Sequence, residues 1–173
     1  IGFQFHLDWQ NFLIMFPLLS GHQLTSGNEL DQFISSLELR GMSSEGTDLV
    51  EQYIKSCWDK GVNVVLDPNL DGPYGVYDPT GNVLILGSKA LDCNVQLIET
   101  LEHEFIHVLQ DQMAGIHNSK MELIGVPQTE YGEAAVDSAY SHLSEEVQEL
   151  ETEAFSAEEL IANPEVDSFS FLG

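Results

Sequence analysis

The chain has 173 residues, of which 43% are hydrophobic, and this is enough for one domain with a buried core but short for two. It carries 29 acidic residues against 5 Lys and Arg, a formal net charge of −24, which disfavours contacts with nucleic-acid phosphates and anionic membrane surfaces. We therefore expect a single domain over residues 1–173 that binds no nucleic acid. The acidity is typical of a solubility device, and a cationic partner or bound cations are the alternative.

The N-terminal segment, residues 1–24, is rich in Phe, Leu and Trp. Its longest apolar run, residues 12–19, is too short to span a bilayer and lacks the preceding basic residues of a signal peptide. We expect no membrane span, and we expect this segment to pack on the domain or on a protein partner. The sequence indicates no compartment, because Cys57 and Cys93 fit one disulfide as well as two free thiols.

Two helices are predicted in the next part of the chain. Apolar side chains at helical spacing predict one over residues 26–39 and another over residues 47–60, separated by a loop at residues 41–46. Thr47 is a suitable cap for the second helix, and Gly61 follows its last residue.

A change of period after the second helix indicates strands. Residues 62–66 are a β-branched run, and shorter apolar runs follow at residues 76–77 and 83–86. Turn-forming residues separate the last two runs at residues 78–82. We therefore expect a small antiparallel meander over residues 62–87.

The second half of the chain is predicted to be helical. One helix runs from Asp92 or Asn94, either of which can cap it, to about residue 113, and a loop follows over residues 116–128. One or two helices then cover residues 130–162, and Pro164 ends them before a tail over residues 164–173. One apolar face of this region is formed by Val147, Leu150, Ala154, Ala157 and Ile161.

The helix predicted to end near residue 113 contains the sequence His103-Glu104-Phe105-Ile106-His107. Two His four positions apart lie one turn apart on the same face of a helix, so both imidazoles reach one ion. A Glu between them lies where it can hold a water molecule on that ion. The spacing predicts a zinc site with His103 and His107 as ligands; two solvated surface histidines are the alternative.

The faces of this helix support the metal site. Four apolar residues lie opposite the two histidines, and four polar residues share their side. The apolar set is Ile98, Leu101, Phe105 and Leu109, and the polar set is Gln96, Glu99, Thr100 and Gln110. The helix is therefore expected to bury one face and to turn its histidines toward a polar cleft, where Glu99 and Gln110 are candidates for orienting the imidazoles.

The His-Glu-x-x-His segment resembles the active-site helix of the zincin metallopeptidases. The predicted meander and the Glu-rich helix downstream are similar to the gluzincin branch, especially its minimal single-domain members, and the resemblance covers residues 47–162. It implies an α+β fold with a small antiparallel sheet packed on the active-site helix and a C-terminal helix that carries a Glu ligand. The metzincin branch is disfavoured, because the Gly and third His that it places after His107 are absent.

The resemblance implies a third zinc ligand on the helix around residues 145–160. Glu151 is favoured because Ala154 follows it three positions later, as the small residue of the family does, although Phe155 stands where the family often has an acidic residue. Glu149 and Glu153 are the alternatives. His117, on the predicted loop, is an outside candidate.

The function implied is hydrolysis of peptide bonds in a peptide or protein substrate. Zn²⁺ held by His103, His107 and Glu151 keeps one position for water, and Glu104 acts as general base. Three side chains are candidates for stabilising the oxyanion, namely Tyr131, Tyr140 and His142. The run at residues 83–86 is expected to offer its backbone to an extended substrate.

Two other functions remain open. The first is a zincin-fold structural or partner-binding subunit of an assembly with a non-catalytic metal site, to which the apolar segment at residues 1–24 and the acidic surface would both contribute. Glu104 argues against it, since a structural site needs no base. The second is a proenzyme in which residues 1–24 occupy the cleft.

Overall fold

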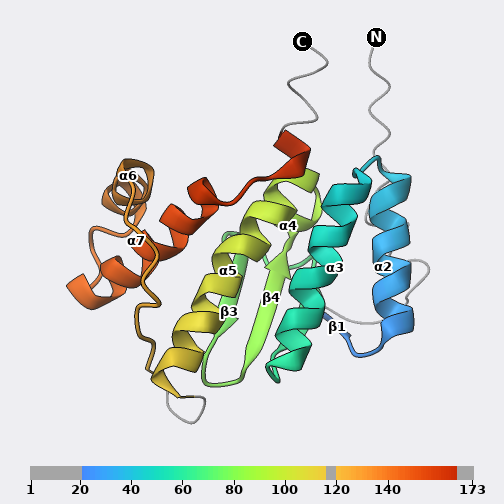
Figure 1. Ribbon diagram of the computed structural model, residues 1–173. Coiled ribbons are helices and arrows are strands. Elements are labelled where there is room, and N and C mark those ends of the chain that lie inside the picture. Colours follow the sequence, from blue (N-terminus) through green and yellow to red (C-terminus); the bar gives the residue numbers. More distant parts are fainter. Residues whose placement is uncertain (1–20, 116–119, 167–173) are drawn as a thin grey trace.

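The computed structural model describes residues 21–115 and 120–166 and has an α+β fold (Figure 1). Its elements in chain order are β1 (His22–Leu24), α2 (Gly27–Leu39), α3 (Ser44–Asp59), β2 (Asn63–Asp67), β3 (Gly75–Asp78), β4 (Val83–Gly87), α4 (Ser88–Leu91), α5 (Asn94–Ala114), α6 (Glu130–Ala139) and α7 (Glu145–Leu160). The predicted helices and the three predicted strands are present, while β1 and α4 were not predicted. No helix in the described part of the chain is long and apolar enough to cross a membrane.

The sheet is mixed, so the prediction of an antiparallel meander is wrong. Its strand order is β1-β2-β4-β3, with β2 and β4 parallel and the two outer pairs antiparallel. The segment between β2 and β4 contains β3 and is long enough to connect two parallel strands. Strand β4 is inserted between β2 and β3. In consequence β4 lies inside the sheet, and the edge strands of the described sheet are β1 and β3.

Two helix starts differ from the prediction. α3 begins at Ser44 and is capped by Ser43, whose hydroxyl accepts a hydrogen bond from the N–H of Gly46, so Thr47 is buried within the first turn. Neither Asp92 nor Asn94 caps α5: Cys93 occupies the N-cap position and makes no side-chain cap bond, and the side-chain oxygen of Asn94 accepts a hydrogen bond from Arg40.

Helix α5 lies at the centre of the fold (Figure 1). Its fully buried Ile98 and Leu101 belong to the main core, which also contains side chains of the sheet, α2 and α3. On its other side Ile106 packs against Ala154 and Ala157 of α7. Helix α5 therefore contributes side chains to both hydrophobic cores. The face of α5 between these two sets of side chains is the part that can border a site.

Several predictions concern the ends of the chain. Helix α7 ends at Leu160, before Pro164 as predicted, and residues 164–166 then form a further helical turn that begins at Pro164. Cys57 is buried, Cys93 is exposed, and both are free thiols. The predictions for residues 1–20, for His117 and for residues 167–173 lie outside the described residues.

Glu102 is a buried acid next to the histidines of α5. It is 1% exposed, and neither carboxylate oxygen has a hydrogen-bond partner among the described residues. Burial, with the nearby charges of Glu158 and Glu99, raises the pKa of Glu102 to about 8. A raised pKa in the folded state means that stability is lost as pH rises from the ordinary carboxyl value of 4.5 toward about 8.

We expect Glu102→Gln, which cannot ionise, to escape this loss. Urea unfolding at pH 5 and pH 8 should show a gain over the wild type that is larger at pH 8 by about 2 kcal/mol. Glu149→Gln, on an exposed acid of α7, serves as the control and should show the same difference from wild type at both pH values. A gain for Glu102→Gln that does not depend on pH would contradict the assignment of a neutral buried carboxyl.

Candidate metal centre

Three side chains from two helices meet between α5 and α7. His103 and His107 are buried on one face of α5, and their Nε2 atoms lie 3.2 Å apart. Glu151 of α7 reaches both, with one carboxylate oxygen 3.1 Å from Nε2 of His103 and the other 3.4 Å from Nε2 of His107. These three residues therefore offer two nitrogens and one carboxylate to a common point.

The spacing of these donor atoms fits a tetrahedral metal ion. Ligand atoms about 2.0–2.1 Å from a tetrahedral zinc ion lie about 3.3 Å from one another. The Nε2–Nε2 contact of 3.2 Å, and the contacts of 3.1 and 3.4 Å that the two oxygens of Glu151 make with one imidazole each, are close to that separation. Two imidazoles and one carboxylate are also a donor set that zinc favours, and in catalytic zinc sites such a set leaves a fourth position for water or substrate.

The orientation of His107 is fixed by a glutamine. The side-chain amide of Gln110 donates to the backbone carbonyl of Leu150 and to the carboxylate of Glu153, each at 3.0 Å. Both partners are acceptors, so the amide oxygen of Gln110 must face Nδ1 of His107, 2.8 Å away. Nδ1 therefore carries the proton, which leaves the lone pair of Nε2 available for a metal ion. The sequence had indicated Gln110 for this role.

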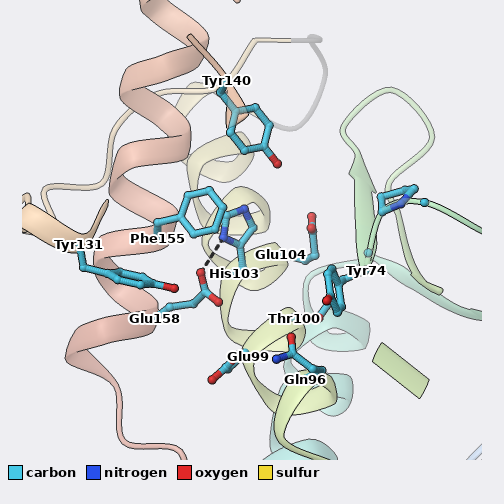
Figure 2. A pocket seen from close by; sticks show the side chains of 13 residues that line it. Tyr74, Gln96, Glu99, Thr100, His103, Glu104, Tyr131, Tyr140, Phe155 and Glu158 are labelled. Atoms are coloured by element: carbon cyan, nitrogen blue, oxygen red, sulfur yellow. Dashed lines mark hydrogen bonds and ion pairs between the residues drawn. The ribbon is translucent and has the colours of Figure 1, made fainter. Parts of the chain in front are cut away.

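The orientation of His103 depends on a residue that the sequence analysis missed. Nδ1 of His103 lies 3.2 Å from the carboxylate of Glu158 on α7 (Figure 2), and a carboxylate can only accept, so Nδ1 carries the proton. Glu158 follows Glu151 by two helical turns, and this spacing was the available signal. Phe155, which departs from the family pattern, packs edge-on against the His103 ring with centroids 4.4 Å apart.

The competing third ligands have other surroundings. Glu149 is exposed to solvent. Glu153 is 2% exposed, and its two oxygens accept hydrogen bonds from Gln110 and from the backbone N–H groups of residues 124–126. Glu153 thus fixes the loop that precedes α6, and of the three candidates Glu151 lies beside both Nε2 atoms.

The cluster is built to hold a positive charge. Burial lowers the pKa of His103, but hydrogen bonds to Glu151 and Glu158 outweigh it and raise that pKa to about 10. Burial likewise raises the pKa of Glu151, but its contacts with the two imidazoles bring it down to about 2. In the metal-free protein a proton supplies the positive charge among these side chains. A metal ion bound by the same atoms would displace that proton.

Glu104 faces the cavity beside this centre and is 8% exposed. Burial raises its pKa, against the opposing effect of the two imidazoles and of a hydrogen bond from the Tyr77 backbone. Strand β3 comes very close here, because a Cβ built on Gly75 would lie 2.6 Å from Thr100 and 3.1 Å from Glu104. A glycine at this position is therefore required for the edge strand to border the base.

The cavity has a volume of about 450 Å³ and is shown in Figure 2. Its lining combines residues of α5, of the segment that leads into β3, and of α6 and α7. They are Gly72, Pro73, Tyr74, Gly75, Gln96, Glu99, Thr100, His103, Glu104, Tyr131, Tyr140, Phe155 and Glu158. Of the polar face predicted for the histidine helix, Gln96, Glu99 and Thr100 line this cavity, while Gln110 is fully buried against α7.

The three candidate oxyanion donors lie in different places. Tyr140 lines the cavity with its hydroxyl directed toward the space above Glu104 (Figure 2), and after burial the charge of Glu151 is the largest influence that raises its pKa. Tyr131 lines the cavity farther along, where the charges of Glu158 and Glu99 act on it. His142 is exposed and is not among the lining residues. Tyr140 is thus the donor nearest the metal centre.

No protein-family model, curated protein or solved structure matches this chain. The chemistry of the site is therefore argued from its own atoms. Those atoms are three donors of suitable type and spacing, two imidazoles with fixed tautomers, and a buried carboxyl beside them.

Replacing Gln110 by Leu should weaken metal binding. His107 would lose the acceptor that fixes its tautomer, and such partners are typically worth about 10–100-fold in metal affinity. We expect a loss of this size in zinc affinity, measured by competition with a chromophoric chelator while circular dichroism monitors the fold. Gln112→Leu, two positions along the same helix, is the matched control, and equal affinities for both variants would refute the role assigned to Gln110.

Proposed function

We propose that this chain is a zinc-dependent metallopeptidase of the zincin type, with His103, His107 and Glu151 as metal ligands and Glu104 as general base. The observation that carries the proposal is the position of Glu104. It is a buried carboxyl that lines the same cavity as His103, one of the three proposed ligands, and it lies beside an edge strand. A site that served structure alone would have no use for an acid there.

The residues around the centre have distinct roles in this reaction. A bound zinc ion would acidify water and polarise the scissile carbonyl. Glu104 accepts the proton of the attacking water and passes it to the leaving amine, and its raised pKa brings it closer to the pH at which it must both take and give a proton. Tyr140, whose hydroxyl is directed into the cavity, would donate a hydrogen bond to the developing oxyanion.

The substrate strand should pair with β3 rather than with β4. The sequence analysis expected residues 83–86 to offer their backbone, but β4 is enclosed between β2 and β3. β3 is an edge of the described sheet, and Gly75 brings it against Glu104. An extended peptide that adds to β3 would therefore run past the base and the metal ligands.

The alternative is a structural or partner-binding subunit with a non-catalytic metal. A structural role does not explain the cavity of about 450 Å³ beside the three donors, and it does not explain why Glu104 lines that cavity. The peptidase accounts for both, and for this reason we favour it.

The reaction is tested by Glu104→Gln. We expect the variant to bind zinc as the wild type does and to cleave peptides about 10²–10⁴-fold more slowly, since it keeps the ligands and loses the base. The measurements are zinc per chain by elemental analysis and cleavage of a mixed peptide library followed by mass spectrometry. One zinc per chain without cleavage by the wild type would favour the structural subunit.

The ligand set is tested by Glu151→Gln beside Glu149→Gln. We expect the first to lose more zinc affinity than the roughly 10–100-fold typical of an outer partner, because it removes an anionic ligand. The second changes an exposed acid on the same helix and should bind zinc as the wild type does. Equal affinities in the two variants would exclude Glu151 as the third ligand.

A further inference from the structure

The cavity extends beyond the metal centre along α5. Glu99 lies one helical turn before His103, and both line the cavity. Figure 2 shows the carboxylates of Glu99 and Glu158 near the ring of Tyr131, with Tyr74 on the opposite side. This end, formed by Glu99, Glu158, Tyr74 and Tyr131, is called the acidic end below. It combines aromatic walls with carboxylates.

At the acidic end, the Glu99 carboxylate has no cationic partner in the part of the chain that the structure describes. The residues that line the cavity in the described chain include no Lys or Arg, and the described residues offer Glu99 neither a hydrogen bond nor an ion pair. Lys89 lies 5.6 Å from the centre of the Tyr74 ring but is not part of the lining. Burial and the charge of Glu158 both raise the pKa of Glu99, so a cation placed here would relieve an unfavourable charge.

Glu158 and Glu99 differ in what they already do. Glu158 is engaged with Nδ1 of His103 and is needed to orient a ligand. Glu99 has no such duty among the described residues. Glu99 is therefore the carboxylate left to meet a substrate.

We propose that the acidic end is a specificity subsite for a Lys or Arg side chain of the peptide substrate, with Glu99 as its specificity-determining residue. This inference rests on the metallopeptidase function proposed above. The methylene stem of the side chain would lie between the rings of Tyr74 and Tyr131, which attract cations through their faces. Its charged end would meet the Glu99 carboxylate in a charge-assisted hydrogen bond.

Other side chains fit this end less well. An acidic side chain would face the charges of Glu99 and Glu158 at short range. An apolar side chain would suit the tyrosine rings but would remove water from Glu99 without replacing its hydrogen bonds. The net charge of −24 acts in the same direction, because it favours the approach of cationic peptides.

The test uses the zinc-loaded full chain and peptides that differ at one position. Cleavage sites from a mixed peptide library first show which position next to the scissile bond is selected. Peptides with Lys, Leu or Glu at that position are then compared by kcat/KM. We expect wild type to favour Lys over Leu by tenfold or more, and Glu99→Gln to reduce that ratio at least fivefold. Glu149→Gln, an exposed acid of α7, should keep the wild-type ratio.

Charge reversal gives a second readout. Glu99→Lys should favour the Glu peptide over the Lys peptide. A ratio unchanged in Glu99→Gln would overturn the subsite even if the protein is an active peptidase.

Binding separates failure of this inference from failure of the proposed function. Glu104→Gln, loaded with zinc, is titrated with the same fluorescent peptides, and the double variant Glu99→Gln/Glu104→Gln serves as its partner. We expect the single variant to bind the Lys peptide at least fivefold more tightly than the Leu peptide, and the double variant to lose that difference. Such binding without any cleavage by wild type would refute the peptidase alone. Equal binding of Lys and Leu peptides would refute the subsite.

Discussion

The pair of imidazoles on α5 sets the constraint on which the rest of the structure depends. Their Nε2 atoms face one another at 3.2 Å inside the protein, and both Nδ1 atoms are committed to acceptors. Two lone pairs at this distance repel each other unless a positive charge lies beside them. The carboxylate of Glu151 contacts both Nε2 atoms and adds a negative charge. The three groups are therefore stable together only when a proton or a metal ion lies among them.

The packing of α7 on α5 and α6 brings Glu151 close enough to contact both imidazoles. Ala154 is fully buried against α5, and a Cβ on Gly132 of α6 would lie 2.2 Å from the Ser156 hydroxyl, so small residues set the approach of both helices. Glu153 then fixes the chain before α6 through the N–H groups of residues 124–126. A single helix, α7, therefore supplies the carboxylate that contacts both imidazoles, the partner of His103 Nδ1, and the carboxylate that fixes a loop.

The sequence predicted those parts of the site that lie within one helix. The positions of His103, Glu104 and His107 follow from a helical repeat, and so does the polar face around them. The choice of Glu151 over its neighbours depends on how α7 is rotated against α5, which the apolar pattern of α7 alone left open. The mixed sheet escaped prediction for a similar reason, because strand order depends on long-range pairing rather than on the composition of each strand.

X-ray absorption spectroscopy of the zinc-loaded protein at the zinc edge tests the central claim most directly. The account predicts one four-coordinate zinc per chain, with two imidazole nitrogens and oxygen ligands at about 2.0–2.1 Å, and one imidazole fewer in a His107→Ala variant. A protein that takes up no zinc, or whose zinc has the same imidazole count in that variant, would contradict it.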